Sequence, residues 1–208
     1  MYLPKLFAES RPEELHRLIR EYPFGMLVTH TSSGLEANHL PFLLDEERGA
    51  CGTLLAHIAR ANPLWTEIVD GGEVLVVFRG AHGYISPNWY VSKHETHRHV
   101  PTWNYEVVHA HGRIHVRDDE KFVRGVVARL TRQHEADQLR PWKMSDAPAD
   151  YLSEELTQIV GIEVELLRVD GKRKLSQNRD ARDFESTVRA LEERGHKELA
   201  LAMKRSLG

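Results

Sequence analysis

The sequence contains a single cysteine, Cys51, among its 208 residues. One cysteine cannot form a disulfide within the chain and cannot supply a zinc site built from cysteine pairs. The sequence also lacks an apolar run near the roughly 20 residues that a membrane-spanning helix needs. Its start, MYLPKLFAES, has neither the basic nor the apolar segment of a signal peptide. We therefore expect a cytoplasmic protein that does not insert into a membrane.

An excess of positive charge is absent as well. The chain has 28 Lys and Arg against 31 Asp and Glu, a formal net charge of −3. No global field therefore attracts nucleic acid, and binding to DNA would need a local basic patch. The one candidate patch is the segment from Lys172 to Arg182, which has five basic residues and one acid.

Two nucleotide-binding motifs are also missing. The sequence has neither G-x-G-x-x-G nor G-x-x-x-x-G-K-[ST], which excludes dinucleotide-binding Rossmann sites and P-loops. We find no internal repeat and no low-complexity linker. With 41% hydrophobic residues, the chain has enough apolar volume for one large core or for a domain with an appendage.

The residue patterns that are present predict alternating strands and helices. Ser10 as N-cap and Glu13 three residues later predict a helix that ends at Pro23. Period-two patterns and turn residues predict strands at 24–30, 35–44, 53–59, 73–80, 82–86, 102–117 and 161–169, with helices at 60–72, 118–135, 153–160 and 181–207. This is an α+β arrangement, and a barrel of six or seven mainly antiparallel strands decorated by helices accommodates it.

The predicted strand 102–117 has two different faces. Val108, Ala110, Ile114 and Val116 share one parity and predict the core face. The opposite face carries aromatic side chains and histidines, namely Trp103, Tyr105, His109, His111 and His115. This second face is expected to be functional or to contact another subunit.

Histidines are dense between Tyr84 and Gly112. His94, His97 and His99 form H-x-x-H-x-H, and His109 and His111 form H-x-H on one face of a strand. Such spacing can bind a metal or haem iron, but polar loops and polar strand faces have the same composition. Because no H-E-x-x-H or two-histidine, one-carboxylate pattern accompanies these histidines, we predict no metal site.

Two segments have the chemistry of phosphate sites. HIARANP leads from a strand through Arg60 to a helix start capped by Asn62, where free N–H groups and a guanidinium converge. GKRKLSQNR supplies further cations, hydroxyls and amides, and PTWNY adds aromatic rings. Together they indicate a flat, anionic, nucleotide-type cofactor, although each segment alone is also compatible with a capped or exposed loop.

Six motifs carry a resemblance to a known family. MYLPKLF, NHLPF, HIARANPLW, GYISPNWY, VPTWNYEVVHAHG and KLSQN occur in the order and approximate spacing of the Pai-type FMN-binding negative transcriptional regulators. The resemblance implies an FMN-binding split β-barrel over residues 1–178, with residues 179–208 as a helical tail packed on the same domain. It also implies a homodimer with FMN at the subunit interface.

The same resemblance implies roles for individual residues. His57, Arg60 and Asn62 are expected to contact the FMN phosphate or ribityl chain. The ring or ribityl chain would be approached by Ser86, Trp103, Asn104 and Tyr105, and the site would be closed, from the partner subunit, by Lys174, Ser176, Gln177 and Asn178. No residue has the pattern of a dedicated acid or base, so no catalytic residue is predicted.

Two classes of function fit these expectations. The first is a negative transcriptional regulator whose flavin senses redox or ligand state, with DNA contacted through the basic segment. The second is an FMN-dependent oxidoreductase of the flavin reductase or oxidase type, with a nicotinamide or another small-molecule redox partner and no DNA binding. A haem-binding or haem-degrading split-barrel protein is a third alternative.

Overall fold

The computed structural model describes residues 1–207, which form two units that interleave along the chain. Unit 1 comprises Met1–Leu18, Arg79–Val108 and the chain from Asp170 onward. Unit 2 comprises Ile19–Phe78 and His109–Val169.

The described residues contain eight strands in a mainly antiparallel sheet with the order β3-β2-β6-β7-β8-β5-β4, and β1 pairs with β8. Within unit 2, β3 also contacts β5, the last strand but one at the other end of this order. The predicted α+β class is confirmed, with eight strands instead of six or seven. The strands are β1 (Ala8–Glu9), β2 (Phe24–Thr31), β3 (Gly34–Pro41), β4 (Leu43–Asp45), β5 (Thr53–Ala59), β6 (Glu73–Ile85), β7 (Thr102–Arg117) and β8 (Ile159–Lys174).

Seven α-helices and three short 3₁₀ helices complete the described part of the chain, in which no helix is long and apolar enough to cross a membrane. The first helix starts at Pro12, two residues after the predicted N-cap Ser10. The helices are α1 (Pro12–Glu21), α2 (Leu64–Glu67), α3 (Val91–Thr96), α4 (Glu120–His134), α5 (Ala149–Thr157), α6 (Ala181–Glu193), α7 (Lys197–Arg205), η1 (Lys5–Phe7), η2 (Pro87–Trp89) and η3 (Met144–Asp146).

The helix predicted over 60–72 is reduced to the single turn α2. Asn62 lies before it and accepts a 3.0 Å hydrogen bond from Leu64 N through Oδ1, as its position in the sequence suggests. The chain leaves the helix at Ile68 because Gly71 and Gly72 pair with Ile114 of β7, at 2.7 and 3.0 Å. Backbone pairing with β7 therefore determines the conformation of residues 71–72, although the local sequence pattern favours a helix there.

The two strands predicted at 73–80 and 82–86 are one continuous strand, β6. The prediction of a break was wrong because Gly80 and Gly83 do not make a turn, and neither has a positive φ. Gly83 allows close packing instead, since a Cβ there would lie 3.0 Å from Leu199 of α7.

Strand β8 likewise continues past its predicted end at residue 169. Gly171, which the sequence suggests begins a loop, lies within the strand where β1 and α1 approach closely. A Cβ at Gly171 would lie 2.2 Å from the Leu15 side chain and 3.0 Å from Glu9 O. Lys172, Arg173 and Lys174 are therefore strand residues, and their side chains alternate between the two faces.

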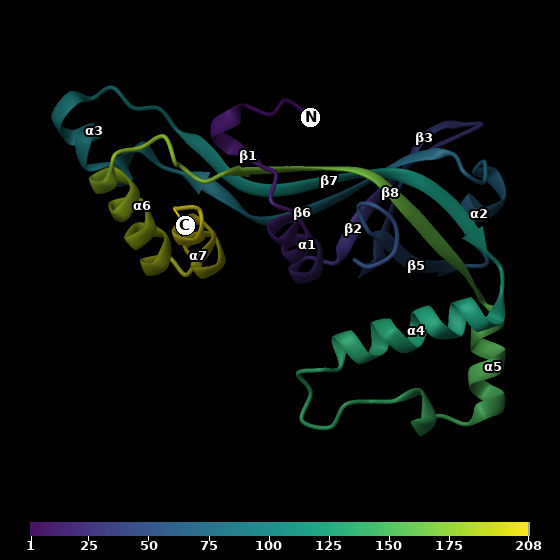
Figure 1. Cartoon of the computed structure of the whole chain (residues 1–208). Coiled ribbons are helices and arrows are strands. Elements are labelled where there is room, and N and C mark those ends of the chain that lie inside the picture. Colours follow the sequence, from purple (N-terminus) through teal and green to yellow (C-terminus); the bar gives the residue numbers. More distant parts are fainter. Residues whose placement is uncertain (208) are drawn as a thin grey trace. The chain divides into compact units, whose positions relative to one another are not determined.

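In unit 2, α4 packs on the short strand pair β4 and β5. Asp119 caps the helix by accepting a 2.7 Å hydrogen bond from Phe122 N. Val126 and Leu130 then pack against Leu43 and Leu55. Helix α5 lies beside α4 and is joined to it by a long segment that contains η3 (Figure 1).

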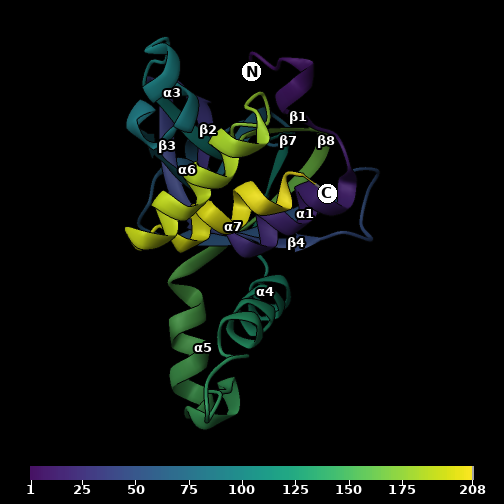
Figure 2. The same ribbon diagram turned by 90° about the vertical axis from the view of Figure 1, so that its left-hand side faces the viewer.

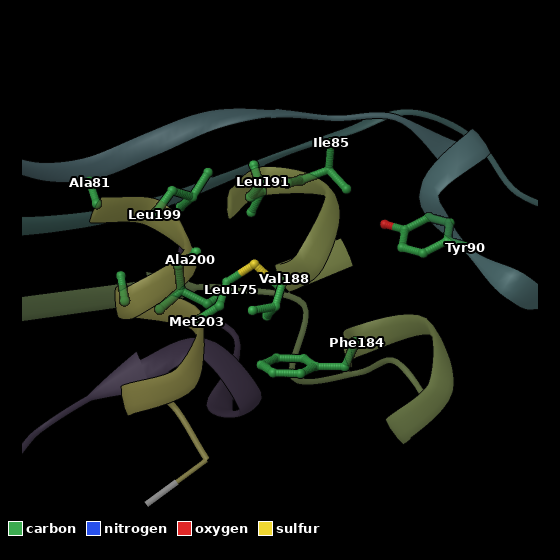
Figure 3. Packing of buried hydrophobic residues seen from close by; sticks show 11 residues of the cluster. Ala81, Ile85, Tyr90, Leu175, Phe184, Val188, Leu191, Leu199, Ala200 and Met203 are labelled. Atoms are coloured by element: carbon green, nitrogen blue, oxygen red, sulfur yellow. The ribbon is translucent and has the colours of Figure 1, made fainter. Parts of the chain in front are cut away.

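In unit 1, α6 and α7 lie side by side in both views (Figures 1 and 2) and cover one face of β6. Ala81 and Ile85 of β6 point into a cluster with Leu175, Val188 and residues of both helices (Figure 3). The two C-terminal helices are thus part of the core of unit 1. The cluster is formed by Ala81, Ile85, Tyr90, Leu175, Phe184, Val188, Leu191, Leu199, Ala200, Ala202 and Met203.

A buried ion network holds the N-terminal segment against β7 and β8 in unit 1. Arg173, only 4% exposed, donates to Glu106 Oε1 at 2.8 Å and to Glu9 Oε2 at 3.3 Å. Glu14 lies 3.3 Å from the same guanidinium. Burial disfavours the charged Glu9, but hydrogen bonds from Arg11 and Arg173 outweigh it and hold the Glu9 pKa at about 2. Because this pKa lies below the usual 4.5, the stabilisation is present above pH 4.5 and is lost as pH falls toward 2.

We expect Glu106→Gln to lower the free energy of unfolding by about 3 kcal/mol, because it leaves the buried Arg173 charge with weaker partners. Glu106→Gln combined with Arg173→Met should recover much of this loss. Urea denaturation of the two variants measures both effects. Glu95→Gln, which breaks the exposed pair with Arg182, is the control and should change little. A loss for Glu106→Gln no larger than for this control would show that the network does not stabilise unit 1.

Candidate functional site

Unit 1 presents a sheet face with aromatic rings and lysines, which we call the aromatic–cationic face. It comprises His82 and Tyr84 of β6, Trp103 and Tyr105 of β7, and Lys172 and Lys174 of β8. These side chains have the opposite parity to Ala81 and Ile85, which face the core, and to Asn104, Glu106 and Arg173, which are buried.

Trp103 lies at the centre of the aromatic part of this face. Its ring is stacked on His82, with centroids 6.0 Å apart and an interplanar angle of 20°. Tyr84 meets the same indole edge-on at 6.5 Å. Trp103 and Tyr84 remain about half exposed, at 49% and 48%. Large aromatic rings left half open to solvent are typical of a ligand site or a subunit interface.

Lys174 is the most constrained cation of the face. Its ammonium donates to Trp103 O at 2.7 Å and also to Thr102 Oγ1, which leaves one of its three N–H bonds for another acceptor. Burial lowers the Lys174 pKa, and the charges of Lys172 and Arg179 lower it further. An electropositive surface of this kind favours an anion, which would restore the pKa of Lys174.

The N-terminal segment covers the other lysine. Lys172 donates to Tyr2 O at 3.0 Å, and its ammonium lies 5.4 Å from the ring centroids of both Tyr2 and Tyr105. The Tyr2 side chain is 84% exposed. Lys172 is thus largely covered, with 8% of its surface exposed, and it is less accessible to a ligand than Lys174.

Several predicted cofactor contacts instead support the turn that follows β8. Asn104 and Ser176, 0% and 3% exposed, hydrogen-bond each other at 2.9 Å. Ser176 has a φ of +68°, and the Gln177 side chain holds this conformation by accepting from Leu175 N and donating to Arg173 O. Asn104, Ser176 and Gln177 therefore fix Lys174 in place, and their polar atoms are used within unit 1.

The remaining predicted contacts of unit 1 are more accessible. Ser86 caps η2 by accepting a 3.2 Å hydrogen bond from Asn88 N, and it is half-buried. Asn178 is exposed. Trp103 and Tyr105 lie on the aromatic–cationic face, as described above.

The three predicted contacts from HIARAN lie in unit 2. Asn62 donates to Asn38 Oδ1 at 2.8 Å. His57 is half-buried, its Nδ1 has no hydrogen-bond partner among residues 1–207, and burial lowers its pKa. A neutral imidazole with a spare nitrogen is suited to a hydrogen bond with a ligand.

Arg60 is engaged within the protein. Its guanidinium forms a two-pronged pair with Asp118, with one contact at 2.9 Å, and Nε donates to Thr157 O at 2.6 Å. A further N–H donates to Ile159 O at 3.3 Å. The hydrogen bond to Asp118 is the main reason why the Arg60 pKa is raised. These partners connect the HIARAN turn to the ends of α5 and β7. Few N–H groups of the guanidinium therefore remain available to a phosphate.

The basic segment 172–182 is not a free cationic patch. All five of its basic side chains have partners in unit 1. Lys172 contacts Tyr2, Arg173 contacts Glu106, Lys174 contacts Trp103 O, Arg179 contacts His99 and Tyr90, and Arg182 contacts Glu95. The predicted DNA contact through this segment therefore has no support in the structure.

The histidine-rich segment forms α3 and the turn after it. His99 is bonded to Ser92 Oγ at 2.8 Å and to Arg179 at 3.1 Å, and His97 ends the helix with a φ of +56°. Within residues 1–207, no group of three or more His, Cys, Asp or Glu side chains is placed to hold a metal ion.

Sequence reasoning missed His82 and Tyr84 as part of the site. By strict alternation both residues share the parity of Val76 and Phe78, which are buried, so the sequence predicts that they face the core. In the structure Gly80 and Ala81 are both buried, and this shift in the alternation leaves His82 and Tyr84 exposed.

A family model described as "Putative FMN-binding domain" matches residues 1–168. A Bacillus subtilis protein named protease synthase and sporulation protein PAI 2 is 30% identical, over 92% of this chain and 89% of the relative. An uncharacterized protein of Emericella nidulans is 32% identical, over 94% and 92%. The FAD and heme binding protein of Mycobacterium smegmatis has a similar fold, with a TM-score of 0.58 and 14% identity, covering 86% of this chain and 78% of that one.

These matches establish the class of protein. The fold is a split β-barrel decorated by helices, as predicted. The chain belongs to the family of FMN-binding-domain proteins, which confirms the resemblance to Pai-type proteins.

Arg60→Ala should lower Tm by about 2–4 °C, because it breaks the Asp118 pair and the bonds to two carbonyls, while flavin affinity stays unchanged. Differential scanning calorimetry and a flavin titration measure the two effects. Arg124→Ala, which removes an exposed pair on α4, is the matched control. Weaker flavin binding with an unchanged Tm would instead show that Arg60 contacts the flavin, as the family resemblance implies.

Proposed function

We propose that the chain binds FMN through the aromatic–cationic face of unit 1. The observation that carries the proposal is the placement of a half-exposed indole, Trp103, next to an ammonium group, Lys174, that has one free donor. A flavin has a flat ring system and a terminal phosphate, so it matches stacked aromatic rings beside a cation. The family's description supports the same cofactor.

The residues present fit this group. Trp103, His82 and Tyr84 would contact the ring system, and Lys174 would hold the phosphate, with Asn104, Ser176 and Gln177 positioning Lys174 from behind. Ser86 and Asn178 of unit 1 remain candidates for polar contacts to the same flavin. Bound flavin would supply one-electron or hydride chemistry, while the protein orients it and sets its electrostatic environment.

We further propose that the protein is a flavin-dependent regulator whose flavin responds to redox or ligand state. The similarity to PAI 2, whose name connects that relative with protease synthesis and sporulation, supports this role. An FMN-dependent oxidoreductase is the second candidate, and the engagement of every basic side chain in 172–182 favours it. Steady turnover of NADH or NADPH by the holoprotein, measured without DNA, would support the second candidate over the first.

Lys174→Met should weaken FMN binding roughly 10-fold to 100-fold, about 1.5–3 kcal/mol, because a hydrogen bond to a charged group is lost. Binding of riboflavin, which has no phosphate, should be weak and should not change. Because the Lys174 pKa is lowered, FMN affinity should fall as pH rises through that pKa, and Lys174→Arg should remove this dependence.

Flavin fluorescence quenching measures these affinities. Lys93→Met, on α3 in the same unit, is the control and should bind FMN normally. Equal affinities of the wild-type protein for FMN and riboflavin would reject a phosphate contact at Lys174.

We also propose that the chain forms a homodimer through this face, because half-exposed aromatic rings need a partner surface and a two-fold dimer covers the same patch twice. Tyr84→Ser with Trp103→Ser should shift the protein from dimer to monomer in light scattering. Leu139→Ser, which replaces a fully exposed apolar residue of unit 2, should not. FMN should increase the dimer fraction by mass action. A wild-type monomer that binds FMN tightly would contradict this arrangement.

A further inference from the structure

A cavity of about 570 Å³ lies in unit 2 between the C-terminal half of α4 and the segment that follows it. Ala128 and Thr131 form the helix side, and Pro141, Trp142 and Met144 form the opposite wall. The volume is within the range of small-molecule sites, and such sites combine apolar walls with a few polar groups. None of these residues belongs to the aromatic–cationic face.

The charged side chains that line this cavity differ in whether they have a hydrogen-bond or ion-pair partner. Arg132 and Lys143 line it, and within residues 1–207 neither side chain forms a salt bridge. The one carboxylate of the lining, Glu135, accepts a 2.8 Å hydrogen bond from Trp142 N. The cavity lining therefore has two cations that form no salt bridge within residues 1–207 and one carboxylate, so its formal charge is positive.

The wall opposite α4 is fixed before any ligand arrives. The bond from Trp142 N to Glu135 ties the segment to the end of the helix, and Lys143 N donates to Asp146 Oδ2 at 3.0 Å to start η3. Trp142 itself remains 43% exposed. A preformed wall reduces the entropy cost of binding, so a small ligand gains more net affinity.

We infer that this cavity binds a small planar organic anion, of which an aromatic carboxylate is the simplest form. The indole of Trp142 offers a flat surface for an aromatic ring, and a guanidinium such as that of Arg132 pairs with a carboxylate through two parallel hydrogen bonds. Lys143 adds a second positive charge. The site would let the protein respond to a metabolite independently of its flavin.

The test uses 2-naphthoate as probe and the indole N–H signals of the full chain in ¹H–¹⁵N NMR, with Trp142→Phe to assign the Trp142 signal. We expect a saturable shift of that signal. The Trp65 signal, whose Nε1 donates to Arg60 O, should stay in place as an internal reference. Arg132→Gln and Lys143→Gln should each weaken probe binding roughly tenfold.

Three controls make the result decisive. The neutral 2-naphthamide should bind at least tenfold more weakly than 2-naphthoate, Arg124→Gln on the same helix should bind the probe normally, and so should Lys174→Met. An unmoved Trp142 signal at millimolar probe would overturn the inference. Equal binding of the amide, or loss of binding in either control variant, would overturn it as well.

Discussion

The buried pair between Arg173 and Glu106 is the interaction on which the candidate site depends. It joins β8 to β7 on the core side of the unit 1 sheet, at 2.8 Å and with both side chains almost fully buried. Because strand residues alternate between faces, fixing Arg173 and Glu106 inward places Lys172, Lys174 and Tyr105 outward. The same network includes Glu9 and Glu14, so the N-terminal segment and the site are stabilised together.

The sequence predicted those parts of the fold whose patterns are local and uninterrupted. The two faces of 102–117 were predicted correctly, because one parity is apolar from Val108 to Val116. The continuity of β6 and the C-terminal end of β8 were not predicted, because glycines such as Gly80 and Gly171 suggest breaks by composition. The close packing at Gly83 and Gly171 depends on residues distant in the sequence, Leu199 of α7 and Leu15 of α1.

The candidate site shows the same limit. Trp103 and Lys174 were predicted as cofactor contacts, and the structure brings them together within one unit. The family resemblance implied cofactor contacts for Asn104 and Ser176, yet their polar groups form a buried hydrogen bond with each other. Arg60 was chosen as a phosphate ligand, but Asp118, 58 residues along the chain, occupies its guanidinium. Residue type predicts which groups can bind a ligand, whereas only the fold shows which groups are still free.

Hydrogen–deuterium exchange of the full chain, with and without FMN, tests the central claim most directly, because it reports where the cofactor binds without altering any residue. FMN should slow exchange in peptides covering 82–86, 102–105 and 172–178, and riboflavin should protect the last of these less. Protection that is absent from all three peptides and confined to other parts of the chain would contradict the placement of the flavin on the aromatic–cationic face.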